Sequence, residues 1–142
     1  MKRTIRILAI AVGVYIVIVV AFESLVVFMG KRQAEHGVAP GEHWLVITTT
    51  DASGAHDTVI AGVEVDGQLY VSANHWSRGW FDRALANPNV AVTRAGVHAS
   101  YRAEPVLGAE RDRVESKYTI PLPIRVLTGF PPRAYLRLTP VT

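Results

Sequence analysis

The residues with the most chemistry to offer lie between positions 72 and 80, where a strand-like pattern changes into a helical one. They combine hydrogen-bonding side chains with two indoles: Ser72, Asn74, His75, Trp76, Ser77, Arg78 and Trp80. Free backbone N–H groups and the helix dipole at such a junction favour an anion, and a guanidinium is a strong phosphate donor. We therefore predict that residues 72–78 bind the anionic group of a cofactor, with Arg78 as its main side-chain partner. His75 is a candidate proton donor to a substrate.

Each of these residues also has a purely structural interpretation. Trp76 and Trp80 could stack on a planar ring, but indoles at helical spacing commonly pack in a core. A lone histidine near a turn, such as His75, is commonly a capping or solvent-facing group. Arg83 follows Arg78 by five residues, about 140° around a helix, which argues against a two-arginine clamp. The five His are scattered without ligand spacing and Cys is absent, so we predict no metal site.

The elements that must position these residues follow an apolar N-terminal segment. Ile7–Met29 is apolar except for Glu23 and Ser24, and about 23 residues can cross a hydrocarbon core of roughly 30 Å. We predict a transmembrane anchor at 1–30, with a cleavable signal peptide as the alternative. Glu23 must then lie near an interface, be protonated or find a partner.

The rest of the chain divides into a polar tether at 31–43 and one domain at 44–142. Short-range basic residues favour a cytoplasmic N-terminus and an extracytoplasmic domain. Beyond residue 30 the chain holds 12 Lys and Arg against 11 Asp and Glu, so the overall charge of +3 does not indicate a nucleic-acid partner. The basic residues gather in 94–142, which indicates either attraction of an anionic ligand or a solvated face.

Strand and helix patterns in the domain predict a mainly β, α+β fold. Six segments have strand character: Trp44–Thr50, Thr58–Val65, Gln68–Asn74, Asn89–Arg94, Val97–Leu107 and Arg133–Pro140. Asp66-Gly67 predicts a tight hairpin. Helical patterns cover 76–87 and 109–118, and the prolines of 121–132 predict loops and short turns. Because strands and helices do not alternate, we predict a small antiparallel split β-barrel with two inserted helices.

A Thr-Thr-Thr strand, a hairpin, and Ser72-Ala73-Asn74-His75-Trp76 leading into Trp80-Phe81-x-x-Ala84-Leu85-Ala86-Asn87-Pro88-Asn89-Val90 follow one another. This order resembles the deazaflavin-dependent nitroreductase family over about residues 44–140. The resemblance implies the split β-barrel of pyridoxamine-phosphate-oxidase-like flavoproteins, a cofactor cleft with phosphate near the first turn and the end of the third strand, and often a homodimer. It also implies a catalytic phenol in the C-terminal third, for which Tyr118 is the candidate.

One turn departs from the pattern of that family. Its members commonly carry a Gly-Arg-Lys-Ser-Gly-like turn whose basic residues hold phosphate, whereas this chain has Asp51-Ala52-Ser53-Gly54-Ala55-His56-Asp57. Two carboxylates there would repel a phosphate. Asp in a Gly-containing turn is also what turn geometry prefers.

Two functions remain as expectations. The first is a membrane-tethered oxidoreductase that uses a deazaflavin coenzyme or flavin mononucleotide (FMN) to reduce a small quinone- or nitro-like acceptor. Its catalytic residues would be His75 and Tyr118, and residues 72–78 with Trp80 would bind the cofactor. The second is a non-enzymatic split-barrel module that binds an apolar ligand such as a lipid or haem, which the missing basic turn favours. No Gly-x-Ser-x-Gly, Walker-type or Gly-x-Gly-x-x-Gly motif occurs, which disfavours the common hydrolases, NTPases and Rossmann enzymes.

Overall fold

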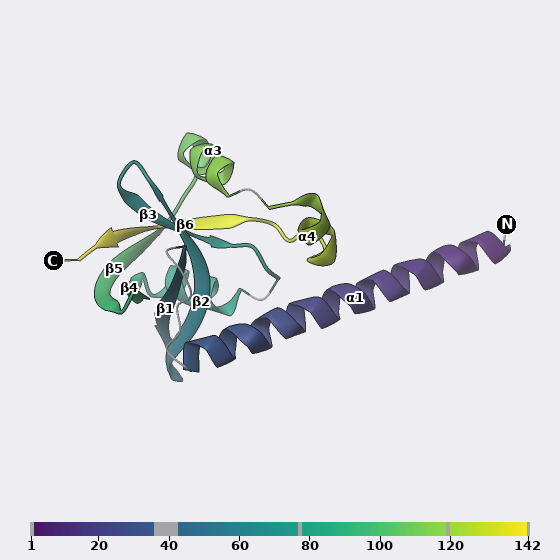
Figure 1. Cartoon of the computed structure of the whole chain (residues 1–142), viewed down its shortest axis with the longest axis horizontal. Helices are drawn as coiled ribbons and strands as arrows, with labels where there is room; N and C mark the ends of the chain where they lie inside the picture. The colour runs from purple at the N-terminus through teal and green to yellow at the C-terminus, as the bar shows by residue number, and fades with distance from the viewer. Residues whose placement is uncertain (1, 36–42, 77, 119, 142) are drawn as a thin grey trace.

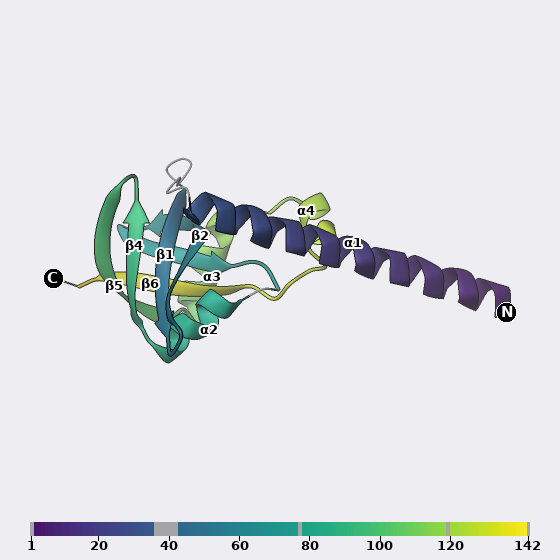
Figure 2. The same cartoon turned by 90° about the horizontal axis from the view of Figure 1, so that it is seen from below.

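A closed six-stranded barrel and a long N-terminal helix make up the molecule (Figures 1 and 2). The computed structural model describes residues 2–35, 43–76, 78–118 and 120–141. The strands are β1 (Trp44–Asp51), β2 (Gly54–Val65), β3 (Gln68–Ala73), β4 (Asn89–Arg94), β5 (Val97–Pro105) and β6 (Ala134–Pro140). The helices are α1 (Lys2–Glu35), α2 (Gly79–Ala86), α3 (Gly108–Lys117) and α4 (Leu122–Leu127). The predicted six-stranded antiparallel barrel is confirmed.

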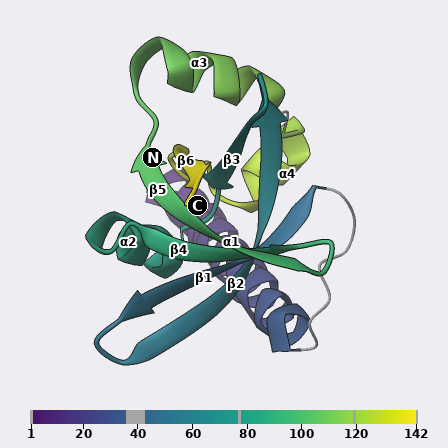
Figure 3. The same ribbon diagram turned by 90° about the vertical axis from the view of Figure 1, so that its left-hand side faces the viewer.

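The strands run around the barrel in the order β1-β2-β3-β6-β5-β4, and β4 pairs back onto β1 (Figure 3). All pairings are antiparallel. The predicted hairpin joins β2 to β3 through Asp66 and Gly67, whose φ angles of 53° and 75° are those of the turn that matches strand twist. This turn fixes which face of β3 points inward, because a slip of one residue would reverse every side chain.

Apolar side chains fill the barrel interior. Alternate residues of the strands point inward and are almost fully buried: Leu45, Ile47, Val71, Val92, Leu136 and Leu138. Helix α2 closes one end with Trp80, Phe81 and Ala84. The rings of Trp80 and Phe81 meet edge to face, with centroids 5.7 Å apart. The core thus fixes the end of β3 and helix α2, the two elements that flank the strand-to-helix junction.

A second apolar cluster lies where α3 covers the outer face of β3 and β6. Its buried members are Val65, Tyr70, Val106, Val114 and Tyr135, with Tyr118 packed against them. The rings of Tyr118 and Tyr135 are 5.5 Å apart. Helix α3 is otherwise charged and exposed, so only one stripe of it contributes to packing.

Several predicted boundaries differ from the structure: strand β2 begins at Gly54 rather than at Thr58, and β5 ends at Pro105 rather than at Leu107. Helix α2 begins at Gly79 rather than at Trp76, because His75 and Trp76 contact other elements and do not continue the helix. The segment after Pro121 includes the helix α4, which was not expected; Pro at the first positions of a helix is compatible with helical geometry. Helix α1 continues to Glu35, so residues 31–35 extend it, and the rest of the expected tether up to residue 42 lies outside the described residues.

Helix α1 is long and apolar enough to cross a membrane, with a mean hydropathy of 2.7 in its most apolar window. A signal sequence near an N-terminus has the same properties. The apolar side chains of its first half are exposed, whereas a stripe in its second half, at Val19, Glu23, Val27 and Gly30, is buried or half-buried. This helical spacing shows that one face of α1 rests on the barrel domain.

Candidate functional site

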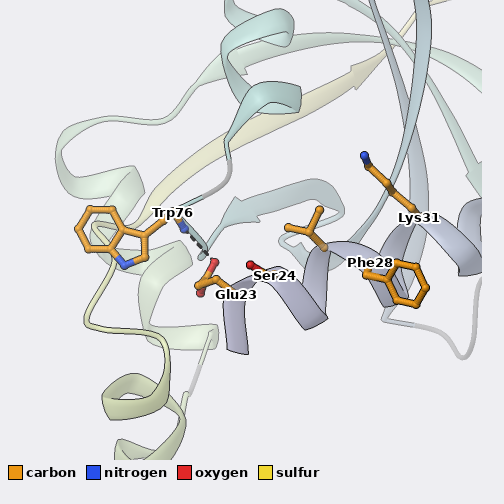
Figure 4. A pocket seen from close by; sticks show the side chains of 6 residues that line it. Glu23, Ser24, Phe28, Lys31 and Trp76 are labelled. Carbon is orange, nitrogen blue, oxygen red and sulfur yellow. Dashed lines mark hydrogen bonds between the residues drawn. The ribbon is translucent and has the colours of Figure 1, made fainter. Parts of the chain in front are cut away.

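The centre of the candidate site is a contact between α1 and the junction that follows β3. Glu23 is 9% exposed. Its carboxylate accepts a hydrogen bond from Nδ1 of His75 at 3.0 Å. It accepts a second one from the backbone N–H of Trp76 at 3.3 Å, which Figure 4 shows as a dashed line. The carboxylate in the apolar segment therefore has a partner, one of the three outcomes expected for it. The nitrogen Nε2 of His75 has no hydrogen-bond partner among the described residues.

Trp76 connects this contact to the segment after α4. Its indole Nε1 donates to the carbonyl of Thr128 at 2.9 Å, while the side chain as a whole remains 54% exposed. Next to Thr128, Gly129 adopts a φ of +68°, and a Cβ there would lie 2.9 Å from Cγ1 of Val19. Tyr15 donates its hydroxyl to the carbonyl of Val126 at 2.8 Å. Helix α1, the junction and α4 are thus one packed unit.

A groove of about 420 Å³ lies along this contact. Its lining combines apolar walls with a few polar groups: Glu23, Ser24, Val27, Phe28, Lys31 and Trp76. Figure 4 shows Trp76 and Glu23 at one end and Phe28 and Lys31 further along α1 at the other. A volume of this size suits a small organic molecule, and such sites are mostly apolar with a few polar groups that orient the ligand.

Ser72 and Asn74 lie at the end of β3 and are not among the residues that line the groove. Asn74 Nδ2 donates to Oγ of Ser72 at 2.6 Å. The other amide atom, Oδ1 of Asn74, is buried and has no hydrogen-bond partner among the described residues. A buried amide oxygen without a donor is costly, so this position would gain from a donor supplied by a ligand or by water.

Arg78 and Trp80 have structural contacts here. The guanidinium of Arg78 donates to the backbone carbonyls of Ala73 and His75, both at 3.2 Å. Trp80 is 6% exposed inside the barrel end, which leaves no indole face for a planar ligand. Ser77 lies outside the described residues, and its predicted role stays a prediction.

Tyr118 is half-buried on the outer face of the barrel, where it packs against the second apolar cluster. Its hydroxyl donates to the carbonyl of Tyr70 at 2.9 Å. Burial raises the pKa of Tyr118 well above its usual range, so the phenol is protonated at neutral pH. The structure therefore brings together His75, Trp76 and Glu23, and it leaves Tyr118 out of the groove lining.

The turn between β1 and β2 contains Ser, His and Asp in mutual contact. Oδ1 of Asp51 accepts hydrogen bonds from Ser53 Oγ at 2.6 Å and from the Ser53 backbone at 2.8 Å, and lies 3.0 Å from Nε2 of His56. Ser53 and Asp51 meet the same ring nitrogen, whereas a hydrolytic triad needs them on opposite nitrogens of the ring. Hydrogen bonds from Ser53 and His56 hold the pKa of Asp51 well below its usual range, so a fixed negative charge occupies this turn.

A positively charged side chain, Arg83 of α2, does lie beside that turn. Arg83 donates from Nε to Oγ1 of Thr49 at 3.0 Å and lies 3.9 Å from Asp51. Arg83 and Arg78 thus serve separate partners, as their angular separation predicted. Elsewhere, ion pairs compensate the basic half of the domain: Arg94–Glu64, Arg102–Glu104, Arg113–Asp66, Arg133–Glu115 and Arg137 with Glu104 and Glu110. This pairing favours the interpretation of a solvated face over attraction of an anionic ligand.

These contacts test whether a phosphorylated cofactor fits. At the junction the donors Trp76 N–H and His75 Nδ1 hold the carboxylate of Glu23, and Arg78 holds carbonyls. At the first turn, the negative charge of Asp51 lies where the resemblance implies phosphate. Neither predicted phosphate position therefore fits the phosphate of FMN or of deazaflavin in this arrangement.

No family model matches the chain, and no curated protein matches it. Solved structures do resemble it. A candidate pyridoxamine 5'-phosphate oxidase from Listeria innocua has a TM-score of 0.53 at 11% identity, covering 70% of this chain and 85% of its own. This chain has the pyridoxamine-phosphate-oxidase-like split-barrel fold. An F420-H2 dependent reductase shares it, with a TM-score of 0.53 at 16% identity over 71% of this chain and 97% of its own. So does HutZ, the haem storage protein of Vibrio cholerae, with a TM-score of 0.51 at 15% identity over 71% and 83%.

Proteins with this split-barrel fold have different functions. The structural similarity therefore establishes the architecture of this chain, and its function must be argued from the residues of the site. Sequence reasoning found the junction but missed the partner, Glu23, and the groove residues Phe28 and Lys31. The signal was present in the sequence: a carboxylate inside an apolar segment needs a partner, and a lone His beyond a strand end could supply one.

Proposed function

We propose that this protein is a membrane-anchored split barrel that binds a lipid-soluble, ring-containing small molecule in the groove between α1 and the barrel. The observation that carries the proposal is the groove itself, which runs from the half-exposed indole of Trp76 to the ammonium of Lys31. Its position against an apolar helix gives a lipid-soluble ligand direct access from a bilayer.

Three of the lining residues have a defined task in this proposal. Trp76 offers an indole face whose orientation is fixed because Nε1 is bonded to Thr128, and a fixed ring loses little entropy on stacking. Phe28 forms the opposite apolar wall. Lys31 donates a hydrogen bond to a carbonyl or acidic oxygen of the ligand. A quinone meets all three requirements.

Haem is a second ligand of the same apolar class, and its candidate ligating residue is His75, which is bonded to the groove residue Glu23 but does not itself line the groove. Its Nδ1 faces the Glu23 carboxylate and its Nε2 has no partner among the described residues. Ligating histidines commonly carry such a carboxylate on the other ring nitrogen.

Reduction of a quinone- or nitro-like acceptor is the second candidate function, supported by the fold shared with an F420-H2 dependent reductase. A deazaflavin or flavin cofactor would supply the hydride for that reaction. Because the two predicted phosphate positions do not fit, this candidate requires a cofactor site elsewhere, for which an interface between two copies of the chain is our proposal.

The test is equilibrium binding to the full chain in lipid nanodiscs, followed by tryptophan fluorescence. The probes are a short-chain benzoquinone, haem, FMN and the deazaflavin coenzyme. We expect saturable quenching by the quinone or haem, weakened about tenfold by Lys31→Gln because a charged hydrogen bond is lost. Lys117→Gln, on the exposed face of α3, is the matched control and should bind like the wild type.

Saturable binding of FMN or deazaflavin without binding of quinone or haem would replace the first proposal by the reductase. Absence of binding by all four probes would overturn both. Quenching that Lys31→Gln leaves unchanged would place the ligand outside the groove.

A further inference from the structure

The part of α1 that precedes its first bond to the barrel domain is too short to span a bilayer by itself. Tyr15 is the first residue of α1 with a hydrogen bond to the barrel domain among the described residues. The segment from Lys2 to Val14 covers about 20 Å at about 1.5 Å per residue, roughly 10 Å less than the hydrocarbon core of a bilayer. If α1 spans, the bilayer must extend past Tyr15, along the part of α1 that α4 accompanies.

The surface beside that part of α1 is apolar and exposed. Helix α4 and the residues after it lie next to α1 in both views (Figures 1 and 2). We call the following exposed side chains the α4 tip: Leu122, Ile124, Val126, Phe130 and Trp76. Exposed apolar patches mark contacts with proteins, membranes or ligands, and continuity with a helix that can span a bilayer favours the membrane.

We infer that the α4 tip is a second membrane contact, inserted among the lipid acyl chains of the leaflet on the barrel side. The inference rests on the proposed membrane anchor and adds to it that the barrel is partly submerged rather than suspended on a tether. The occupant of this surface is lipid, because the surface continues the exposed apolar face of α1 at the same depth.

Hydrogen bonding in the tip meets the requirement that lipid imposes. Backbone groups in hydrocarbon need partners within the protein. The carbonyl of Val126 accepts from Tyr15 and from the Gly129 N–H, and the carbonyl of Ile124 accepts from the Thr128 N–H and hydroxyl. The Phe130 N–H donates to the carbonyl of Arg125.

The charged groups near the α4 tip need not enter the hydrocarbon. The guanidinium of Arg125 lies 5.5 Å from the centre of the Phe130 ring, and a side chain of this length reaches headgroup phosphate while its stem stays in hydrocarbon. Glu23 is buried against His75 and the Trp76 N–H, which shields its charge from lipid.

Spin labelling tests the inference directly, because the chain has no Cys and each introduced Cys carries the only label. The variants are Ile124→Cys and Phe130→Cys in the tip, Val12→Cys on the free part of α1, and Leu107→Cys on the barrel as an exposed apolar control. The full chain is reconstituted in phosphatidylcholine vesicles. The measured quantity is the ratio of collision rates with oxygen, which concentrates in lipid, and with a water-soluble nickel complex.

We expect lipid-type ratios at residues 12, 124 and 130 and a water-type ratio at 107. A lipid-type ratio at 12 with water-type ratios at 124 and 130 would overturn the submerged tip while leaving the anchor intact. Low collision rates with both reagents at 124 and 130 would indicate a protein interface and overturn the inference as well. A water-type ratio at 12 would overturn the anchor, and the tip inference with it.

Discussion

Replacing Glu23 by Ala should weaken the contact between α1 and the junction after β3. The substitution removes two hydrogen bonds to a carboxylate, from His75 and from the Trp76 N–H. Charged hydrogen bonds contribute about 1.5–3 kcal/mol each, but the Trp76 bond is long at 3.3 Å and His75 is partly exposed, so solvent screens the pair. We take about 2 kcal/mol for both bonds together. Glu23→Gln keeps one acceptor oxygen and should cost about half as much.

The Trp76 amide reports this loss, because Glu23 is its acceptor. Hydrogen exchange of a protected amide measures the free energy of local opening. A cost of about 2 kcal/mol corresponds to exchange about 30-fold faster, measured on the full chain in nanodiscs. Ser24→Ala is the control, because among the described residues the Ser24 hydroxyl bonds to the Val20 carbonyl within α1 and to no other group. An unchanged exchange rate of the Trp76 amide in Glu23→Ala would refute the reasoning.

Three further substitutions probe the barrel and its packing. Gly129→Ala places a Cβ 2.9 Å from Val19 at a positive φ, so the thermal midpoint should fall, at a cost in stability of about 1–2 kcal/mol. Adding Val19→Ala should restore part of the lost stability. An unchanged midpoint in Gly129→Ala would contradict the close contact. Tyr118→Phe loses the bond to the Tyr70 carbonyl, so chemical unfolding should show a loss of about 1 kcal/mol. Since burial raises the pKa of Tyr118, the stability that Tyr118 provides should decline as the pH rises above about 10. An equal dependence of stability on alkaline pH in wild type and Tyr118→Phe would argue against this. The pKa of Asp51 is depressed, so the stability that Asp51 contributes is present above about pH 4 and is lost as the pH falls further. Asp51→Asn should therefore reduce the fall of the thermal midpoint with decreasing pH. An identical acid dependence in wild type and variant would exclude this contribution.

Local patterns predicted the barrel strands well, because each signal is contained in neighbouring residues. The run of aromatic and β-branched residues in β1 and the Asp66-Gly67 turn require no knowledge of distant contacts. The start of α2 was wrong for the opposite reason. The 76–78 segment has helical spacing, but Trp76 bonds to Thr128, 52 residues away, and tertiary contacts override local preference.

The junction shows how far chemical reasoning reaches from the sequence. Two donors of the junction, His75 Nδ1 and the Trp76 N–H, bind the carboxylate of Glu23, whereas the predicted cofactor anion at Arg78 stays a prediction. The pairing of residues so far apart in the chain follows from how α1 lies against the barrel. Periodicity within either segment contains no information on that placement.

The place of β6 in the barrel determines when folding can finish. The last strand in chain order inserts between β3 and β5, so both of those edges stay unpaired until Pro140 has been synthesised. Helix α1 ends about 100 residues before Pro140, so if it is the proposed membrane anchor, it can reach the membrane while the barrel is still open. Exposed strand edges invite aggregation. Early delivery to a membrane surface would hold each nascent barrel apart from its neighbours during this vulnerable interval.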